Sequence, residues 1–317
     1  MNSATNRPVL YVVLLLTCMV GTYVYKLRTA GIFACTAAAY PRDGYLAYCN
    51  AGAYGDFDHG ALLFDLAPAA TRAAQRADVL FLGNSRLQFG LSSNATRQWF
   101  TGHGRSHYLL GFSHLENMTF VRPLLERLRP QAKAYVINVD RFFTTEESEP
   151  GGQLLHGTDM ERRYRQKASW QTLHRALCGA HPGWCGQKLA FYRELQDGHW
   201  TQASGTPDAP QAIAEGEISE RDQWPQYAEL ARQYIASLPV PRECVLLTHV
   251  PSPQSKTAEA RFIADAVGLP LIAPEVPGLQ TFDDTHLNVP SAQRWSQAFF
   301  DAAGEQLERC TAAGTHP

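Results

Sequence analysis

Residues 77–86 read ADVLFLGNSR, an apolar run that ends in glycine, asparagine, serine and arginine. The run Ala77–Leu82 has the length and composition of a buried strand, and the Gly-Asn-Ser that follows it is typical of a turn. Four more short apolar runs lie downstream: His107–Leu110, Ala134–Val139, Cys244–Val250 and Leu269–Ile272. The sequence therefore predicts five buried strands.

Amphipathic stretches separate these apolar runs and predict helices. They lie at about Leu115–Leu128, Gln226–Ser237, Lys256–Val267 and Pro290–Leu307. Strands that alternate with helices are typical of a parallel sheet whose strands are joined by crossover helices. We therefore predict an α/β fold, a three-layer α/β/α sandwich around a central, mostly parallel, five-stranded sheet.

The composition fits one large domain with an ordinary core. The chain has 317 residues, of which 45% are hydrophobic and 18% are charged. Lys and Arg total 28 against 30 Asp and Glu, and the net charge of −2 provides no basic field for a nucleic-acid backbone. We expect no nucleic-acid partner.

The main domain is expected at residues 76–310, with residues 30–75 as a linker and N-terminal extension. Residues 141–224 interrupt the alternation of strands and helices because they are rich in Gly, Pro, His, Trp and charge, and we predict an insertion or cap there. Its tryptophans either present their rings to a sugar or pack the small core of the cap: Trp170, Trp184 and Trp200.

The N-terminus carries an apolar segment. Pro8–Tyr25 has eighteen residues without a charge, which as a helix span roughly 27 Å, close to the thickness of a hydrocarbon core. We expect residues 1–29 to form an uncleaved membrane anchor, with a cleaved signal peptide or a buried core helix as the alternatives. Arg7 and the α-amino group before the segment roughly balance Lys26 and Arg28 after it, so charge alone does not decide the orientation.

Cysteine usage indicates the compartment. Cys18 lies in the apolar segment, and six cysteines remain: Cys35, Cys49, Cys178, Cys185, Cys244 and Cys310. Pairing the first two and the next two closes short loops and leaves the last two for each other, which suits an oxidising compartment. Reduced, buried thiols are the alternative. No Cys-x-x-Cys or His/Cys ligand cluster occurs in the sequence, so we expect neither a metal nor a cofactor.

The candidate site residues follow predicted strands, because open α/β sheets carry reactive residues at the carboxyl ends of their strands. A serine hydroxyl is a weak nucleophile until a base takes its proton and a third group orients that base. Ser85, His286 and Asp283 fit these roles as nucleophile, base and orienting carboxylate. The backbone N–H groups of Ser85 and Gly111, with a side-chain amide, would stabilise an oxyanion.

At these residues the chain resembles the SGNH, or GDSL-like, hydrolase superfamily. The resemblance covers about residues 76–310 without the insertion. The family's Gly-Asp-Ser corresponds to Gly83-Asn84-Ser85, its second-block glycine to Gly111, and its Asp-x-x-His to Asp283 and His286. The resemblance implies the α/β/α fold and a serine esterase or acyltransferase without a cofactor.

The third block of the family departs from its usual pattern here. The Gly-x-Asn-Asp motif is absent, and the oxyanion asparagine that the resemblance implies is Asn138, with Asn117 as a second candidate. Arg86, next to the serine, either binds an acidic group of the substrate or pairs with Asp140.

An N-terminal membrane helix followed by an SGNH-like domain resembles the bacterial proteins that work beside membrane-bound O-acyltransferases in acetylating alginate, cellulose, peptidoglycan or teichoic acid. The resemblance implies an extracytoplasmic domain held at the cytoplasmic membrane by residues 8–25, a polysaccharide acceptor, and an acyl donor supplied by a membrane partner. A carbohydrate or lipid esterase is one alternative. A degenerate module that only binds polysaccharide or a membrane acyltransferase is the other.

Overall fold

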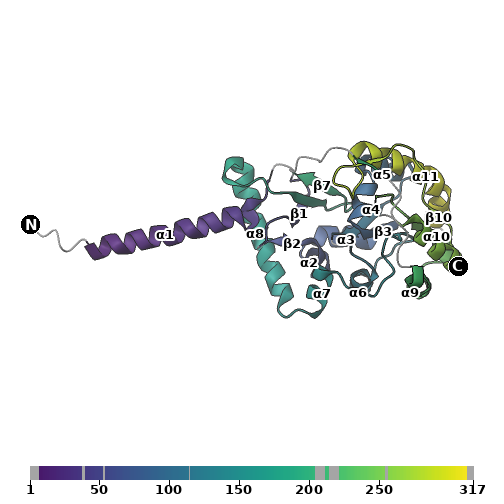
Figure 1. Ribbon diagram of the computed structural model, residues 1–317, viewed down its shortest axis with the longest axis horizontal. Helices are drawn as coiled ribbons and strands as arrows, with labels where there is room; N and C mark the ends of the chain where they lie inside the picture. The colour runs from purple at the N-terminus through teal and green to yellow at the C-terminus, as the bar shows by residue number, and fades with distance from the viewer. Residues whose placement is uncertain are drawn as a thin grey trace, which may run out of the picture.

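The computed structural model describes residues 7–37, 40–52, 54–113, 115–203, 211–213, 221–253 and 256–312. Figure 1 shows one long helix, α1 (Arg7–Thr29), that projects away from a globular part containing the remaining elements. The chain enters the globular part through the short helix η1 (Ile32–Ala34). The side chains of α1 therefore have no part in the core of the domain.

A five-stranded parallel sheet forms the centre of the main domain. Its order is β10-β9-β5-β3-β4, and every pair of neighbours is parallel. The strands are β3 (Val79–Asn84), β4 (His107–Phe112), β5 (Ala134–Asn138), β9 (Val245–Thr248) and β10 (Leu271–Ile272). Each overlaps one of the five predicted runs, so the α/β prediction with a five-stranded parallel sheet is confirmed.

Both faces of this sheet are apolar. Successive side chains of a strand point to opposite faces, and in β3 Leu80 and Leu82 join one buried cluster while Val79 and Phe81 join another. The helices of the domain are α3 (Pro68–Arg76), α4 (Ser85–Gly90), α5 (Ser93–Gly102), α6 (Met118–Leu128), α9 (Trp224–Ala236), α10 (Thr257–Val267) and α11 (Val289–Thr311). Burial on both faces explains why the strands are continuous apolar runs.

A second, antiparallel sheet joins two distant parts of the chain. Its order is β2-β1-β6-β7, with Gly44 of β1 paired with Glu194 of β6. The strands are β1 (Gly44–Cys49), β2 (Gly55–Asp56), β6 (Ala190–Glu194) and β7 (Trp200–Ala203). The stretch 30–75, expected as a linker and N-terminal extension, shares this sheet with the insertion 141–224 over its described residues.

The remaining elements lie mainly in the extension and the insertion. They are α2 (Asp58–Leu63), α7 (Glu149–His156), α8 (Met160–Ala180), η2 (Pro182–Trp184), η3 (Arg221–Gln223), η4 (Arg242–Cys244) and the paired short strands β8 (Gln211–Ala212) and β11 (Gln280–Thr281). In Figure 1 the second sheet and α8 lie between α1 and the five-stranded sheet.

A buried ion pair fixes the second sheet to the first. Arg193 of β6 is fully buried, and its guanidinium binds both carboxylate oxygens of Asp58, at 2.7 and 2.5 Å. The same guanidinium donates hydrogen bonds to the carbonyls of Leu109 and Gly111 in β4, each at 2.5 Å. The insertion is thus held beside the strand end where the candidate site lies.

A second buried charge network surrounds His59 of α2. The His59 ring lies 2.9 Å from a carboxylate oxygen of Asp56 and 2.8 Å from one of Glu116. Burial alone would lower the pKa of His59, but the two carboxylates outweigh it and raise this pKa to about 10. His59 is therefore an imidazolium at neutral pH and joins the extension to the segment after β4.

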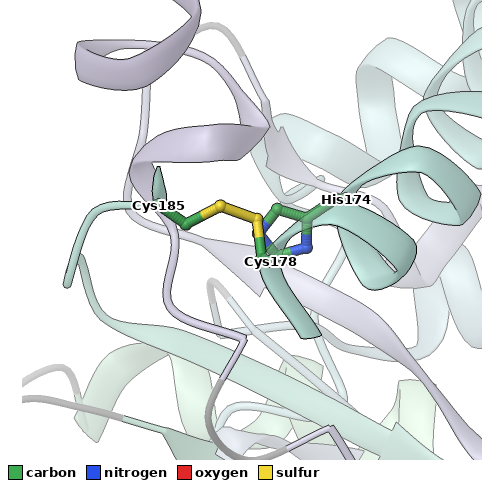
Figure 2. Close-up of side chains that lie close together, drawn as sticks. All are labelled: His174, Cys178 and Cys185. Carbon is green, nitrogen blue, oxygen red and sulfur yellow. A yellow bond between two sulfur atoms is a disulfide. The ribbon is translucent and has the colours of Figure 1, made fainter. Parts of the chain in front are cut away.

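Three disulfides link the cysteines in the expected pairs: Cys35–Cys49, Cys178–Cys185 and Cys244–Cys310. Figure 2 shows the second of these beside His174 of α8. That ring is already engaged, because its two nitrogens lie 3.1 Å from the carbonyl of Cys35 and 3.2 Å from the hydroxyl of Tyr40. The disulfides indicate an extracytoplasmic location.

One helix among the described residues, Pro8–Thr29, is long and apolar enough to cross a membrane, and none of its apolar window is buried in the structure. Exposed side chains include Leu14, Leu15 and Leu16, each more than half accessible. The buried-core-helix alternative is therefore wrong. The helix is either a membrane span or a signal sequence.

Candidate active site

Asn84 shapes the turn that presents the candidate nucleophile. β3 ends at Asn84, and α4 begins at Ser85, so the serine lies at the carboxyl end of a central strand. The Asn84 side-chain oxygen accepts a hydrogen bond from the backbone N–H of Arg86 at 3.0 Å, and its amide donates to the backbone carbonyl and carboxylate of Asp140. Asn84 therefore caps the helix and ties the turn to the end of β5.

The structure brings Ser85, His286 and Asp283 together in one hydrogen-bonded chain. Ser85 Oγ lies 2.8 Å from His286 Nε2, and His286 Nδ1 lies 2.7 Å from Asp283 Oδ2. A carboxylate only accepts hydrogen bonds, so the network assigns the proton to Nδ1. Nε2 then carries a lone pair that accepts the hydroxyl proton of Ser85, as a general base requires.

The loop before α11 holds the carboxylate in place. The other oxygen of Asp283, Oδ1, accepts the backbone N–H groups of Thr285 at 3.2 Å and His286 at 2.8 Å. Partial burial by itself raises the pKa of Asp283, but the hydrogen bonds and the electrostatic attraction from His286, with the two backbone N–H groups, outweigh it and lower this pKa below its ordinary value. Asp283 is thus ionised at neutral pH.

The geometry gives Gly111 a packing role. It lies beside Gly83 in the β3–β4 register, and its carbonyl accepts hydrogen bonds from Gln88 and Arg193. A Cβ at this position would come within 2.8 Å of Gln88 Cγ and 3.0 Å of the Asn84 carbonyl oxygen. Glycine is therefore needed for the close approach of α4 to β4.

The two asparagines expected at the oxyanion site differ in what their amides do. Asn117 caps α6 with its oxygen and donates from Nδ2 to the Glu146 carbonyl at 2.9 Å. Asn138 is fully buried at the end of β5, and its oxygen accepts the Val250 N–H at 3.1 Å. Its Nδ2 has no hydrogen-bond partner among the described residues. Of the two asparagines, Asn138 is therefore the one whose side-chain N–H groups remain able to donate to an oxyanion.

Arg86 forms the ion pair that was one of its two expected roles. Its guanidinium lies 2.6 Å from Asp140 Oδ2, and both side chains are about 5% exposed or less. Burial raises the pKa of Asp140, but Arg86, His249 and Asn84 together lower it. The pair lines a cavity of about 200 Å³ that also includes His249 and Lys256.

An aromatic group beside the triad was not predicted. The ring of Phe89 lies 4.7 Å from the His286 ring and 5.3 Å from the rings of both Phe282 and Phe191, measured between centroids. Phe191 stacks on Trp200 at 5.3 Å with an interplanar angle of 8°. We call these four side chains, Phe89, Phe191, Trp200 and Phe282, the aromatic row.

One signal in the sequence could have found the row. Phe89 is four residues after Ser85 in the same helix, so the two side chains share a face. Phe191 and Trp200 come from the second sheet, whose pairing the sequence does not reveal. Trp200 is 8% exposed and packs against Phe191 and Phe89, whereas Trp184, also suggested for sugar contact, is 61% exposed.

The comparisons with known proteins add nothing to this geometry. No family model, no curated protein and no solved structure matches the chain. The case for a function therefore rests on the arrangement of Ser85, His286 and Asp283 and on the side chains around them.

Proposed function

We propose that the protein is a membrane-anchored, extracytoplasmic, SGNH-like serine O-acyltransferase that acylates a cell-envelope polysaccharide. The observation that carries this proposal is the hydrogen-bonded chain from Ser85 through His286 to Asp283. A parallel sheet in the order β10-β9-β5-β3-β4, with the serine directly after β3, supports an SGNH-like three-layer arrangement around it.

The reaction proceeds through an acyl-serine. Ser85 Oγ attacks the carbonyl carbon of the donor ester while His286 Nε2 takes the hydroxyl proton, and Asp283 stabilises the imidazolium. The intermediate collapses when His286 returns the proton to the leaving oxygen, which breaks the donor ester bond. A hydroxyl of the acceptor then attacks the acyl-serine carbonyl while His286 takes its proton. The acyl–Oγ bond breaks as His286 returns this proton to Ser85 Oγ, which releases the acylated acceptor and regenerates Ser85.

The oxyanion is stabilised by the backbone N–H of Ser85, the N–H of Gly111 and the amide of Asn138. The unpartnered Nδ2 of Asn138 supports its inclusion. Each such donor contributes about 3 kcal/mol where it contacts the developing charge.

The aromatic row supports transfer to a sugar. Phe89 and Phe282 contact His286, and both side chains are half-buried. Aromatic faces stack on the apolar faces of sugar rings and displace water from the acceptor side of the triad. Arg86 pairs with Asp140 beside the serine and is not assigned to an acidic group of the substrate.

Hydrolysis is the second candidate reaction. The His286 side chain is 15% exposed and that of Asp283 is 35% exposed, so water reaches the triad. With water as the acceptor, the same acyl-serine gives an esterase.

The proposed location is the cytoplasmic membrane, with α1 as a single-pass anchor and the domain on the extracytoplasmic side. The three disulfides and the apolar length of α1 support it. The acyl donor would then come from a membrane-bound partner on the same side.

The test uses the full-length protein in detergent with 4-nitrophenyl acetate as donor. We expect turnover and, by intact mass, one acetyl group on the protein. Ser85→Ala should abolish both, whereas Ser169→Ala, an exposed serine of α8, should leave both unchanged. Adding oligosaccharides separates the reactions, because a transferase forms a sugar ester and an esterase releases only acetate. A folded wild type with neither turnover nor adduct would contradict the enzyme assignment.

A further inference from the structure

Two buried histidines face each other at the edge of the main sheet. His107 is the first residue of β4, and His199 lies in the turn between β6 and β7. Their exposed fractions are 7% and 1%, and their Nε2 atoms are 3.4 Å apart. A carboxylate lies beside them: one oxygen of Asp197 and one ring nitrogen of each histidine are all within 4.8 Å of one another.

The separation of the two nitrogens suits a shared ligand better than a direct hydrogen bond. An N–H···O hydrogen bond has a donor–acceptor distance of about 2.7–3.2 Å, and the N···N separation of 3.4 Å is longer. Two imidazole nitrogens bound to one zinc ion at about 2.05 Å, at the tetrahedral angle, are roughly 3.4 Å apart. The rings are thus spaced as two ligands of one tetrahedral ion.

The carboxylate is already oriented by its neighbours. Arg97 donates from Nε to Asp197 Oδ2 at 2.5 Å and also binds Glu194 at 2.6 Å. The other oxygen of Asp197 accepts the backbone N–H of His199 at 3.2 Å. Ligating carboxylates are usually held by such outer hydrogen bonds.

We propose that His107, His199 and Asp197 form a binding site for Zn²⁺ or a similar divalent transition metal ion, with water as the fourth ligand. Two imidazoles and one carboxylate are a ligand set that zinc accepts. The set is too poor in oxygen for Ca²⁺ or Mg²⁺.

The role of this site is structural. β4 is the last strand of the sheet, and the turn after β6 lies along it, with the Leu109 N–H donating to the Asp197 carbonyl at 2.9 Å. His107 pairs with Val79, six residues before Ser85, which corresponds to about 20 Å along the strand. The ion would therefore clamp the insertion to the sheet edge and take no part in chemistry at Ser85.

The test measures binding of Zn²⁺ alone to the full-length protein in detergent, after chelator treatment. We expect one zinc ion per chain by elemental analysis, and Co²⁺ in its place should give the visible absorption of a tetrahedral site. His107→Gln and His199→Gln should each weaken zinc binding by about 100-fold or more, since each removes a direct ligand.

The matched control is His156→Gln, which changes an exposed histidine on α7 that pairs with Glu147. It should bind zinc as tightly as the wild type, and Ser85→Ala should do the same because the site is remote from the triad. Far-UV circular dichroism identifies any variant that fails to fold. The proposal is overturned if the folded wild type binds no zinc at micromolar concentrations, or if both His107→Gln and His199→Gln bind it undiminished.

Discussion

Replacing Asp283 by asparagine should invert the hydrogen bonding of the triad. In the structure Asp283 Oδ1 accepts two backbone N–H groups, those of Thr285 and His286. An asparagine must keep its carbonyl oxygen at that position, because an NH₂ group there would face two donors. Its NH₂ group is therefore forced toward His286 Nδ1 and donates to it. The proton of the ring then moves to Nε2, where it blocks acceptance of the Ser85 proton.

The expected fall in kcat of the Asp283→Asn variant follows from the loss of the productive His286 tautomer. In serine triads with this geometry the same inversion lowers kcat by about 10⁴-fold, or about 5 kcal/mol of transition-state stabilisation. Turnover of 4-nitrophenyl acetate by the full-length protein measures it. The ¹⁵N chemical shifts of the His286 ring report the tautomer directly and do not depend on the choice of substrate.

The control is Asp284→Asn, the same substitution one residue later. Asp284 is exposed and has a φ of 61°, which asparagine adopts readily, so activity should stay within about threefold. If Asp283→Asn keeps more than a tenth of the wild-type rate, or if its His286 ring still carries the proton on Nδ1, the assignment of Asp283 as the orienting group is refuted.

Three further predictions concern stability. The pKa of His59 is about 10 in the folded state and about 6.5 in the unfolded state. Its contribution to the free energy of unfolding is therefore complete below pH 6.5 and is lost as the pH rises toward 10. His59→Gln should remove that part of the pH dependence of the urea midpoint. Arg193→Met leaves Asp58 buried without its cation and should cost about 3–5 kcal/mol in urea unfolding, whereas Arg72→Met on an exposed face should cost less than about 0.5 kcal/mol. A disulfide that closes a longer loop removes more conformational entropy from the unfolded chain. Paired Cys→Ser variants should therefore lose roughly 4 kcal/mol for Cys244–Cys310, with a sequence separation of 66, and roughly 2.5 kcal/mol for Cys178–Cys185, with a separation of 7. Equal losses in the two variants would contradict this dependence on loop length.

The strands of the main sheet were predictable because they are buried on both faces. Runs such as Ala134–Val139 have no polar side chain until the strand ends, and helices at 3.6-residue spacing separate them. The polar residues of the site were predictable for a second reason. The carboxyl ends of parallel strands lie at one edge of the sheet, where polar residues that follow the strands meet. Ser85, Asp283 and His286 meet there although the serine and histidine are 201 residues apart.

The second sheet could not be predicted in the same way. β1 reads GYLAYC and carries no signal for its partner, because its antiparallel pairing depends on a strand about 140–150 residues later rather than on local pattern. The aromatic row and the His107–His199 contact depend on that pairing. The sequence likewise shows no ligand spacing for these histidines, which are 92 residues apart.

The pairing of β1 with β6 also bears on how the chain is made. β1 is complete at Cys49, but its partner ends at Glu194 and the hairpin closes only at Ala203, about 150 residues later. At synthesis rates of about 5–20 residues per second, the edge of β1 that faces β6 keeps its N–H and carbonyl groups unpaired for roughly 8–30 s. Both cysteines of the Cys35–Cys49 disulfide, which closes a short loop, are synthesised before β6. An oxidase that acts early during export would therefore protect this strand from pairing with other nascent chains.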